Sequence, residues 1–332
     1  MPVIEVKDLK RTFGEFVAVK AVSFEVEEGE IFGFLGPNGA GKSTTINMLC
    51  TLLKTSGGSA SVNGYDVATQ QDKVRRSIGL IFQDPTLDER LTGWQNLQFH
   101  AMLYDVPTET FKERSAELLE MVELTDKVRE SVQSFSGGMK RRLEIARGLL
   151  HHPKVLFLDE PTIGLDPQTR WHIWEYLENV RDRERLTLFL TTHYMDEAEV
   201  CDRIAIIDHG EIVALDSPDK LKSMVGGDVV TLSTDDNARA TSVLAGMDIE
   251  HQVTSEGLRV EIAHGDQFIP RVMRAMDEAQ PRVSITSVNL RRPTLEDVFI
   301  KLTGRAIRDE EASATDMMRN RRRAGGWGGG RR

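Results

Sequence analysis

The most chemically distinctive stretch of the chain is a glycine-rich segment that ends in a lysine and two hydroxyl residues. It has the pattern G-x-x-x-x-G-K-S, which is typical of loops that bind phosphate groups. The apolar residues of 31–35 before it predict a strand, and the periodic apolar residues of 45–53 after it predict a helix. This context favours a phosphate-binding loop over a plain glycine-rich turn. The loop consists of Gly36, Pro37, Asn38, Gly39, Ala40, Gly41, Lys42, Ser43 and Thr44.

The residue types of this loop suit a triphosphate, whose charged oxygens must be approached closely. Gly36, Gly39 and Gly41 lack side chains that would block the approach, so backbone N–H groups can converge on the phosphates. The start of the helix that follows adds a positive partial charge. Lys42 supplies a full positive charge for the β- and γ-phosphates, and the Ser43 hydroxyl is suited to bind Mg²⁺.

A second chemical feature is an apolar run, 155–158, that leads directly into Asp159 and Glu160. The run predicts a buried strand, and an acidic pair at the end of such a strand is the usual partner of a phosphate loop. We expect Asp159 to hold the Mg²⁺ shell and Glu160 to orient and deprotonate an attacking water. The alternative is a solvated strand end without a chemical role.

Three further features have two interpretations each. Phe13 lies upstream of the loop, where its ring could stack on adenine or be a partly buried strand residue. Ser136, Gly137 and Gly138 precede a predicted helix and form either an anion-receptive helix start or an ordinary cap. His193 follows the predicted strand 186–192, and it is either a γ-phosphate contact or a structural histidine.

The elements that position these residues fall into two predicted domains. Strands before and after the phosphate loop belong to a first domain over residues 1–225, which contains a helical subdomain at about 88–152. Residues 226–304 show the order β-α-β-β-α-β, which is the ferredoxin-like arrangement, followed by a further helix. Residues 305–332 are rich in arginine and glycine and lack periodicity, which predicts disorder.

Composition limits the class of protein. The chain has 332 residues, of which 28% are charged, and this is ordinary for a globular protein of about two domains. The net charge of −10 argues against a surface that coats nucleic acid. No apolar run approaches the ~18 residues that a membrane-spanning helix needs. Cys50 and Cys201 lie in apolar patterns and predict neither a disulfide framework nor a metal site. A cytosolic protein fits these features.

Taken together and in order, the motifs resemble those of the nucleotide-binding subunit of ABC transporters, over about residues 3–220. This resemblance implies an α/β fold with a P-loop NTPase (ABC ATPase) core, beside the small α+β ferredoxin-like C-terminal domain. The C-terminal extension, residues 226–304, ends in P293TLEDVFIKLTG304 and is similar to the C-terminal domain of the daunorubicin/doxorubicin-resistance subfamily of ABC ATPases. The motifs are Phe13, G36PNGAGKST44, Gln83, S136GGM139, L156FLDEP161, G164LDP167 and His193.

The resemblance implies roles for individual residues. Phe13 corresponds to the adenine-stacking position, with phenylalanine in place of the usual tyrosine, and Gln83 to a lid glutamine that contacts Mg²⁺ and senses the membrane partner. The signature segment, Ser136-Gly137-Gly138, would close on the γ-phosphate held by the opposite subunit. Asp166 would lie in the loop that crosses the dimer interface, and His193 corresponds to the switch histidine. Met139 stands where glutamine is commoner, so no side-chain role is assigned there.

The implied activity is ATP hydrolysis with Mg²⁺, coupled to export of a drug or lipid-like cargo. The implied partners are a second copy of the chain, in an ATP-sandwich dimer, and a separate transmembrane permease. The chain would then lie on the inner face of the cell membrane through that permease, and no nucleic-acid partner is expected. The alternatives are a soluble ABC-type ATPase that acts on nucleic acid or ribosomes, and a module that senses ATP without turnover.

Overall fold

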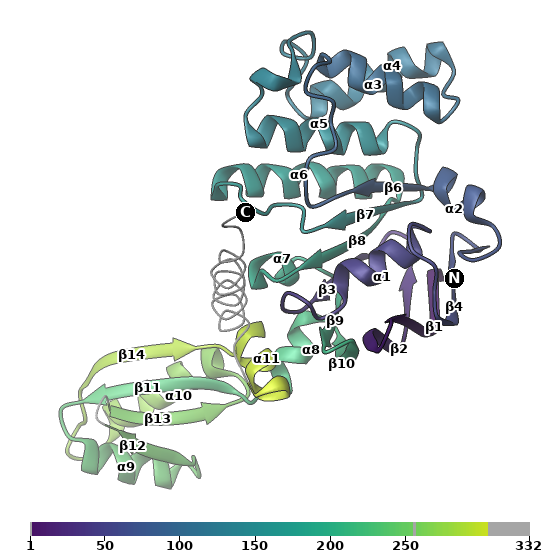
Figure 1. The fold of residues 1–332 in the computed structure, drawn as a ribbon. Coiled ribbons are helices and arrows are strands. Elements are labelled where there is room, and N and C mark those ends of the chain that lie inside the picture. The colour runs from purple at the N-terminus through teal and green to yellow at the C-terminus, as the bar shows by residue number, and fades with distance from the viewer. Residues whose placement is uncertain (1, 255–256, 305–332) are drawn as a thin grey trace, which may run out of the picture. The chain divides into compact units, whose positions relative to one another are not determined.

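The computed structural model describes residues 2–254 and 257–304, which form two compact units (Figure 1). The first unit runs to Ser217 and the second begins at Pro218, eight residues before the predicted boundary. The difference arises because α8 packs against α11, the last helix of the second unit. The predicted disordered segment 305–332 lies outside the described residues. The two helices are α8 (Pro218–Ser223) and α11 (Leu295–Thr303).

The first unit is built on a six-stranded sheet with the order β10-β9-β3-β8-β7-β6. Five of its strands run parallel, and β10 pairs antiparallel with β9. Every residue of β3, β7 and β8 is buried. Burial explains the continuous apolar runs 31–35 and 155–158, whereas β8 also buries three threonines. The strands are β3 (Ile31–Leu35), β6 (Ile78–Ile81), β7 (Val155–Asp159), β8 (Thr187–Thr192), β9 (Arg203–Asp208) and β10 (Glu211–Asp216).

A second sheet of the first unit is antiparallel and has the order β2-β1-β4-β5. Its strand β1 extends from Pro2 to Phe13. The alternation of apolar and polar residues is interrupted because the pairing of β1 with β2 shifts register at several bulges. Phe13 ends β1 and pairs with Phe16 of β2. The strands are β1 (Pro2–Phe13), β2 (Phe16–Glu27), β4 (Gly57–Val62) and β5 (Tyr65–Asp66).

Helices connect the strands and make up most of residues 93–149. The helix that follows residue 92 begins at a capping box, in which Thr92 and Gln95 each bond the other's backbone N–H. The helices of this unit are α1 (Lys42–Leu49), α2 (Gln71–Ser77), α3 (Gly93–Leu103), α4 (Thr108–Met121), the 3₁₀ turn η1 (Val132–Ser134), α5 (Gly137–Leu149), α6 (Pro167–Glu184) and α7 (Met195–Glu199).

The second unit confirms the predicted β-α-β-β-α-β order. Its four strands form one antiparallel sheet with the order β12-β13-β11-β14, which packs on its helices around a separate apolar core. Within the described residues, neither unit contains a helix of the length and apolarity needed to cross a membrane. The elements are β11 (Asp228–Thr234), α9 (Asn237–Gly246), β12 (His251–Thr254), β13 (Gly257–Ile262), α10 (Gly265–Glu278) and β14 (Ile285–Arg291).

Candidate functional site

Parallel strands bring the predicted site residues to one edge of the six-stranded sheet. In the order of the sheet, β3, β8, β7 and β6 are adjacent, and their carboxyl ends lie at the same edge (Figure 1). Gly36 follows β3, His193 follows β8, Glu160 follows β7, and Gln83 lies two residues after β6. Open α/β sheets bind ligands at the carboxyl ends of their strands, so these residues form a candidate strand-edge site.

The phosphate loop can only be built from glycine at two of its positions. A Cβ on Gly36 would lie 2.3 Å from the Ile207 carbonyl oxygen. Gly41 has a φ of +110°, and a Cβ there would lie 2.7 Å from the Ala18 carbonyl oxygen. No side chain among the described residues caps the N-terminus of α1, so its first backbone N–H groups are available to an anion.

Lys42 is buried at the start of α1, with 4% of its surface exposed. Its Nζ donates hydrogen bonds to the carbonyl oxygens of Gly36, at 2.7 Å, and Pro37, at 3.1 Å. The same Nζ lies 3.4 Å from Glu160 Oε1. The ammonium is thus held at the mouth of the loop by polar groups that a phosphate oxygen can replace.

Oxygen atoms from three elements meet beside the loop. Ser43 Oγ donates to Asp159 Oδ1 at 3.1 Å, and Thr191 Oγ1 donates to the same carboxylate oxygen. Hydroxyl and carboxylate oxygens are the hard ligands that Mg²⁺ prefers, and one or two carboxylates with substrate phosphates are its usual set. The residues present therefore fit a magnesium ion, and Thr191 is a member of this cluster that the sequence analysis missed.

The Glu160 carboxylate contacts both Lys42 and His193. His193 Nδ1 lies 3.2 Å from Glu160 Oε1, the same carboxylate oxygen that Lys42 contacts. Burial raises the pKa of Glu160, but the His193 hydrogen bond and the charge of Lys42 outweigh burial and hold the pKa below its usual value. The backbone of Glu160 is left-handed, with a φ of +48°, and its N–H bonds Thr191 at both the carbonyl and the hydroxyl.

Two predicted site residues lie on the surface of the first unit. Phe13 is 45% exposed at the end of β1, and the Arg11 guanidinium lies 4.5 Å from its ring centroid. Gln83 is exposed in a bend after β6, at the sheet edge that also carries Glu160. Both side chains are exposed to solvent.

The signature segment and Asp166 both cap helices. Ser136 is exposed and accepts a hydrogen bond from the Met139 N–H at 3.2 Å, at the N-terminus of α5. Asp166 accepts hydrogen bonds from the Thr169 N–H and hydroxyl at the start of α6. In Figure 1, α5 and α1 lie apart, with α6, β7 and β8 between them in the view. One chain therefore does not bring its signature segment to its own phosphate loop.

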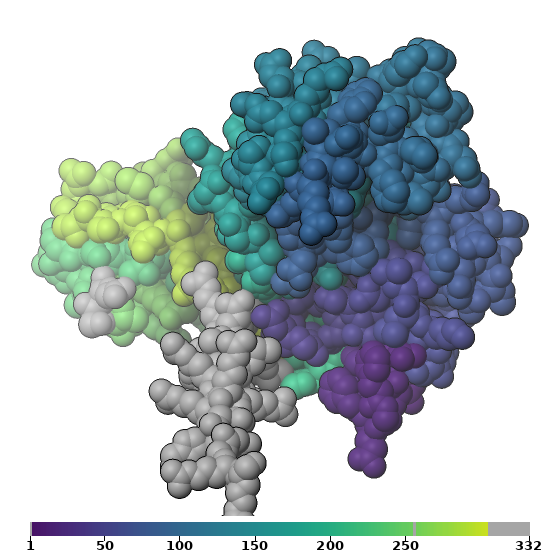
Figure 2. Space-filling view, turned by 45° about the horizontal axis from the view of Figure 1, so that its top comes forward, coloured from purple at the N-terminus to yellow at the C-terminus, as the bar shows by residue number. Residues whose placement is uncertain are grey.

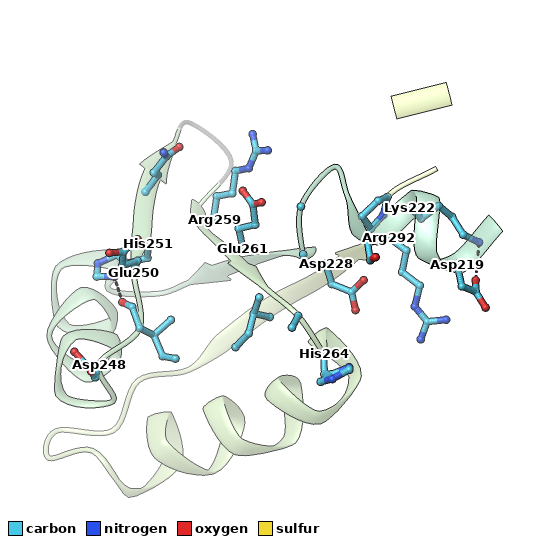
Figure 3. A pocket seen from close by; sticks show the side chains of 18 of the residues that line it. Asp219, Lys222, Asp228, Asp248, Glu250, His251, Arg259, Glu261, His264 and Arg292 are labelled. Carbon is cyan, nitrogen blue, oxygen red and sulfur yellow. Dashed lines mark hydrogen bonds and ion pairs between the residues drawn. The ribbon is translucent and has the colours of Figure 1, made fainter. Parts of the chain in front are cut away.

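The second unit has a wide depression on its surface (Figure 3). It is lined by side chains of both charge signs, among them Asp228, Arg259, Glu261 and Arg292. In Figure 3 these side chains extend in different directions and do not converge on one point. A small-molecule site needs a few convergent polar groups, and the labelled side chains of this depression do not provide them.

Comparison with known proteins agrees with this geometry. Residues 19–163 match the family described as "ABC transporter", and residues 217–303 match "ATP-binding protein DrrA1-3-like, C-terminal domain". The linearmycin resistance ATP-binding protein LnrL of Bacillus subtilis is 37% identical over 92% of this chain and 100% of its own length. The daunorubicin/doxorubicin resistance ATP-binding protein DrrA of Streptomyces peucetius is 39% identical over 95% and 97%.

Solved structures of ATP-binding cassettes share the fold. An ATP-binding subunit of an ABC transporter is 31% identical, with a TM-score of 0.62 over 67% of this chain and 92% of that chain. The cassette MJ0796, in a dimeric post-hydrolysis state bound to ADP and Pi, is 28% identical, with a TM-score of 0.59 over 64% and 98%. With its strand-edge site and both family matches, the chain belongs to the ATP-binding, ATP-hydrolysing subunits of ABC transporters, in the subfamily of the daunorubicin/doxorubicin resistance proteins.

Proposed function

We propose that this protein powers a membrane exporter by closing as a pair of chains around ATP. The observation that carries the proposal is the division of the site residues between two places on one chain. Lys42, Ser43, Asp159, Glu160 and His193 lie together, whereas the signature segment lies apart from them. A second copy of the chain supplies a signature segment to each phosphate loop, and ATP is bound between the two.

Each residue at the strand edge then has a distinct task. Backbone N–H groups of residues 36–44 and the Lys42 ammonium bind the phosphates, and the exposed Phe13 ring stacks on adenine. Glu160 accepts a proton from the attacking water, and His193 orients the Glu160 carboxylate. Ser43, Asp159 and Gln83 are the residues that would hold Mg²⁺, which when bound neutralises charge on the phosphates.

The residues that would meet the other chain across the pair interface lie at the N-termini of α5 and α6. Ser136 and the two glycines after it leave the N-terminus of α5 exposed, which suits a contact with the γ-phosphate held by the other chain. The Asp166 carboxylate is held in place by Thr169, so the loop before α6 has a fixed shape for a contact across the interface.

The membrane partner is a separate permease, which keeps this chain at the inner face of the membrane. Three exposed apolar side chains near the end of α3 offer it a docking surface: Phe99, Met102 and Leu103 are 58%, 71% and 63% exposed. The cargo is a drug or a lipid-like molecule, because relatives over nearly the whole chain are named for resistance to linearmycin and to daunorubicin and doxorubicin.

The pairing can be tested by blocking turnover. Glu160→Gln should bind Mg·ATP, hydrolyse it slowly and form a particle of twice the 37.3 kDa chain mass in light scattering. Adding Lys42→Ala should abolish this doubling. The proposal fails if Glu160→Gln stays at the mass of one chain with Mg·ATP, both alone and with its membrane subunit.

A further inference from the structure

One face of α5 carries three charged residues at a spacing of three: Arg141, Glu144 and Arg147. Arg141 is 6% exposed and Glu144 is 1% exposed, so both charges are removed from water. Buried charges of this kind are retained at a cost unless their hydrogen bonds are satisfied. The hydrogen-bond partners of these three residues lie in the segments after β6 and β7.

Arg141 forms hydrogen bonds to backbone carbonyl oxygens of two segments, one that follows β6 and one that follows β7. Its guanidinium donates to the carbonyl oxygens of Phe82, at 2.5 Å, Pro161, at 2.5 Å, and Glu160, at 3.4 Å. It also donates to Glu144 Oε2 at 3.2 Å. Phe82 directly precedes Gln83, and Pro161 directly follows Glu160. The planar guanidinium with its five donors can serve these acceptors together, which a lysine cannot do.

The other two residues fix the segment that follows Gln83. Glu144 Oε1 accepts the Thr86 N–H at 2.6 Å and the Thr86 hydroxyl at 3.1 Å. Arg147 donates to the Thr86 carbonyl oxygen at 3.0 Å and to its hydroxyl at 2.5 Å. The segment 82–86 is therefore bound at both ends to α5, while Gln83 between them stays exposed.

The same helix begins at the signature segment. The hydrogen bonds of Arg141 and Glu144 join α5 to the backbone beside Gln83 and Glu160, so a displacement of α5 imposed by a second chain on Ser136 would also displace that backbone. We propose that Arg141, paired with Glu144, is a positioning residue that couples the signature helix to the lid glutamine and to the catalytic carboxylate. The inference rests on the proposed roles of Gln83 and Glu160, and Arg141 itself does not touch the reacting atoms.

The test compares two neighbouring arginines of α5 in the full chain. Arg141→Met removes the contacts to 82, 160 and 161. Arg142→Met is the matched control, because Arg142 also pairs with a carbonyl and a glutamate, at Val122 and Glu123, away from the strand edge. Arg141→Met should lower kcat about 10- to 100-fold, with KM for Mg·ATP and the Kd of ADP changed less than about threefold. Arg142→Met should leave kcat within about twofold of the parent.

Two further variants separate positioning from folding. In Arg141→Met/Glu144→Leu the unpaired buried carboxylate is also removed, so the midpoint of urea unfolding should return toward the parent while kcat stays low. Combining Arg141→Met with Gln83→Ala should lower kcat by less than the product of the two separate effects, because both act on one segment.

The outcomes distinguish the inference from the function on which it rests. The inference is overturned if Arg141→Met turns over like Arg142→Met, if the double variant with Glu144→Leu recovers both stability and kcat, or if the effects of Arg141→Met and Gln83→Ala multiply. If instead Glu160→Gln turns over like the parent, the assigned base is wrong and the proposed function fails, whatever the Arg141 variants show.

Discussion

The Lys42 ammonium and the Glu160 carboxylate, 3.4 Å apart and almost fully buried, form a direct ion pair at the mouth of the phosphate loop. The residue proposed to bind phosphate and the residue proposed to activate water therefore interact directly in the absence of nucleotide. His193 contacts the same Glu160 carboxylate, so the three side chains form one interacting group. A phosphate group that takes the Lys42 ammonium must compete with Glu160 for it.

This competition predicts that Glu160→Gln binds nucleotide more tightly. Glutamine keeps the shape of the side chain but removes the charge that pairs with Lys42 and repels phosphate. We expect the Kd of Mg·ADP to fall about 3- to 10-fold, measured by calorimetry. ADP is the appropriate ligand because neither hydrolysis nor ATP-driven pairing then contributes. An equal or weaker affinity would show that the ion pair does not compete with nucleotide.

The second prediction concerns Lys42 itself. Lys42→Ala removes the ammonium group that donates hydrogen bonds to the carbonyl oxygens of Gly36 and Pro37 in the phosphate loop. ADP should therefore bind at least about 30-fold more weakly. Lys54→Ala is the control, because Lys54 is an exposed lysine beyond the end of α1. Unchanged binding by Lys42→Ala would remove the role assigned to this residue.

The sequence predicted the chemical groups of the site better than their arrangement. The phosphate loop, Asp159, Glu160 and His193 stand at strand ends, so the parallel sheet alone brings them together. Thr191 was missed because a threonine within a strand has no distinctive pattern, although it bonds both Asp159 and Glu160. The contacts of Arg141 are equally absent from the sequence, since they join backbone carbonyls about 20 and 60 residues away.

The third prediction is a pH dependence of stability. The pKa of Glu160 is lowered in the folded chain, so its contribution is fully present above the unfolded value of about 4.3 and is lost as the pH falls through the folded pKa. Glu160→Gln should unfold about 1–3 kcal/mol more easily than the parent at neutral pH. This difference should shrink below about pH 4, in urea titrations of both proteins. A difference that is constant with pH would show that ionised Glu160 does not stabilise the fold.

The fourth prediction follows from the boundary between the two units. A fragment of residues 1–217 should fold and bind ADP with the affinity of the full chain, because every residue of the strand-edge site lies before Ser217. A fragment of residues 1–225 should bind equally but aggregate more readily. It keeps α8, whose Leu221 is fully buried in the whole chain, without α11 against which α8 packs.

Light scattering and calorimetry on the two fragments would test this boundary. Leu221→Ser in the fragment 1–225 is the control. It should make this fragment as soluble as the fragment 1–217, because it removes the newly exposed apolar group. The interpretation would be wrong if the fragment 1–217 failed to bind ADP while the fragment 1–225 bound it. Residues 218–225 would then belong to the ATP-binding unit, despite the Lys301 hydrogen bonds to Met224 and Val225 that join them to the second unit.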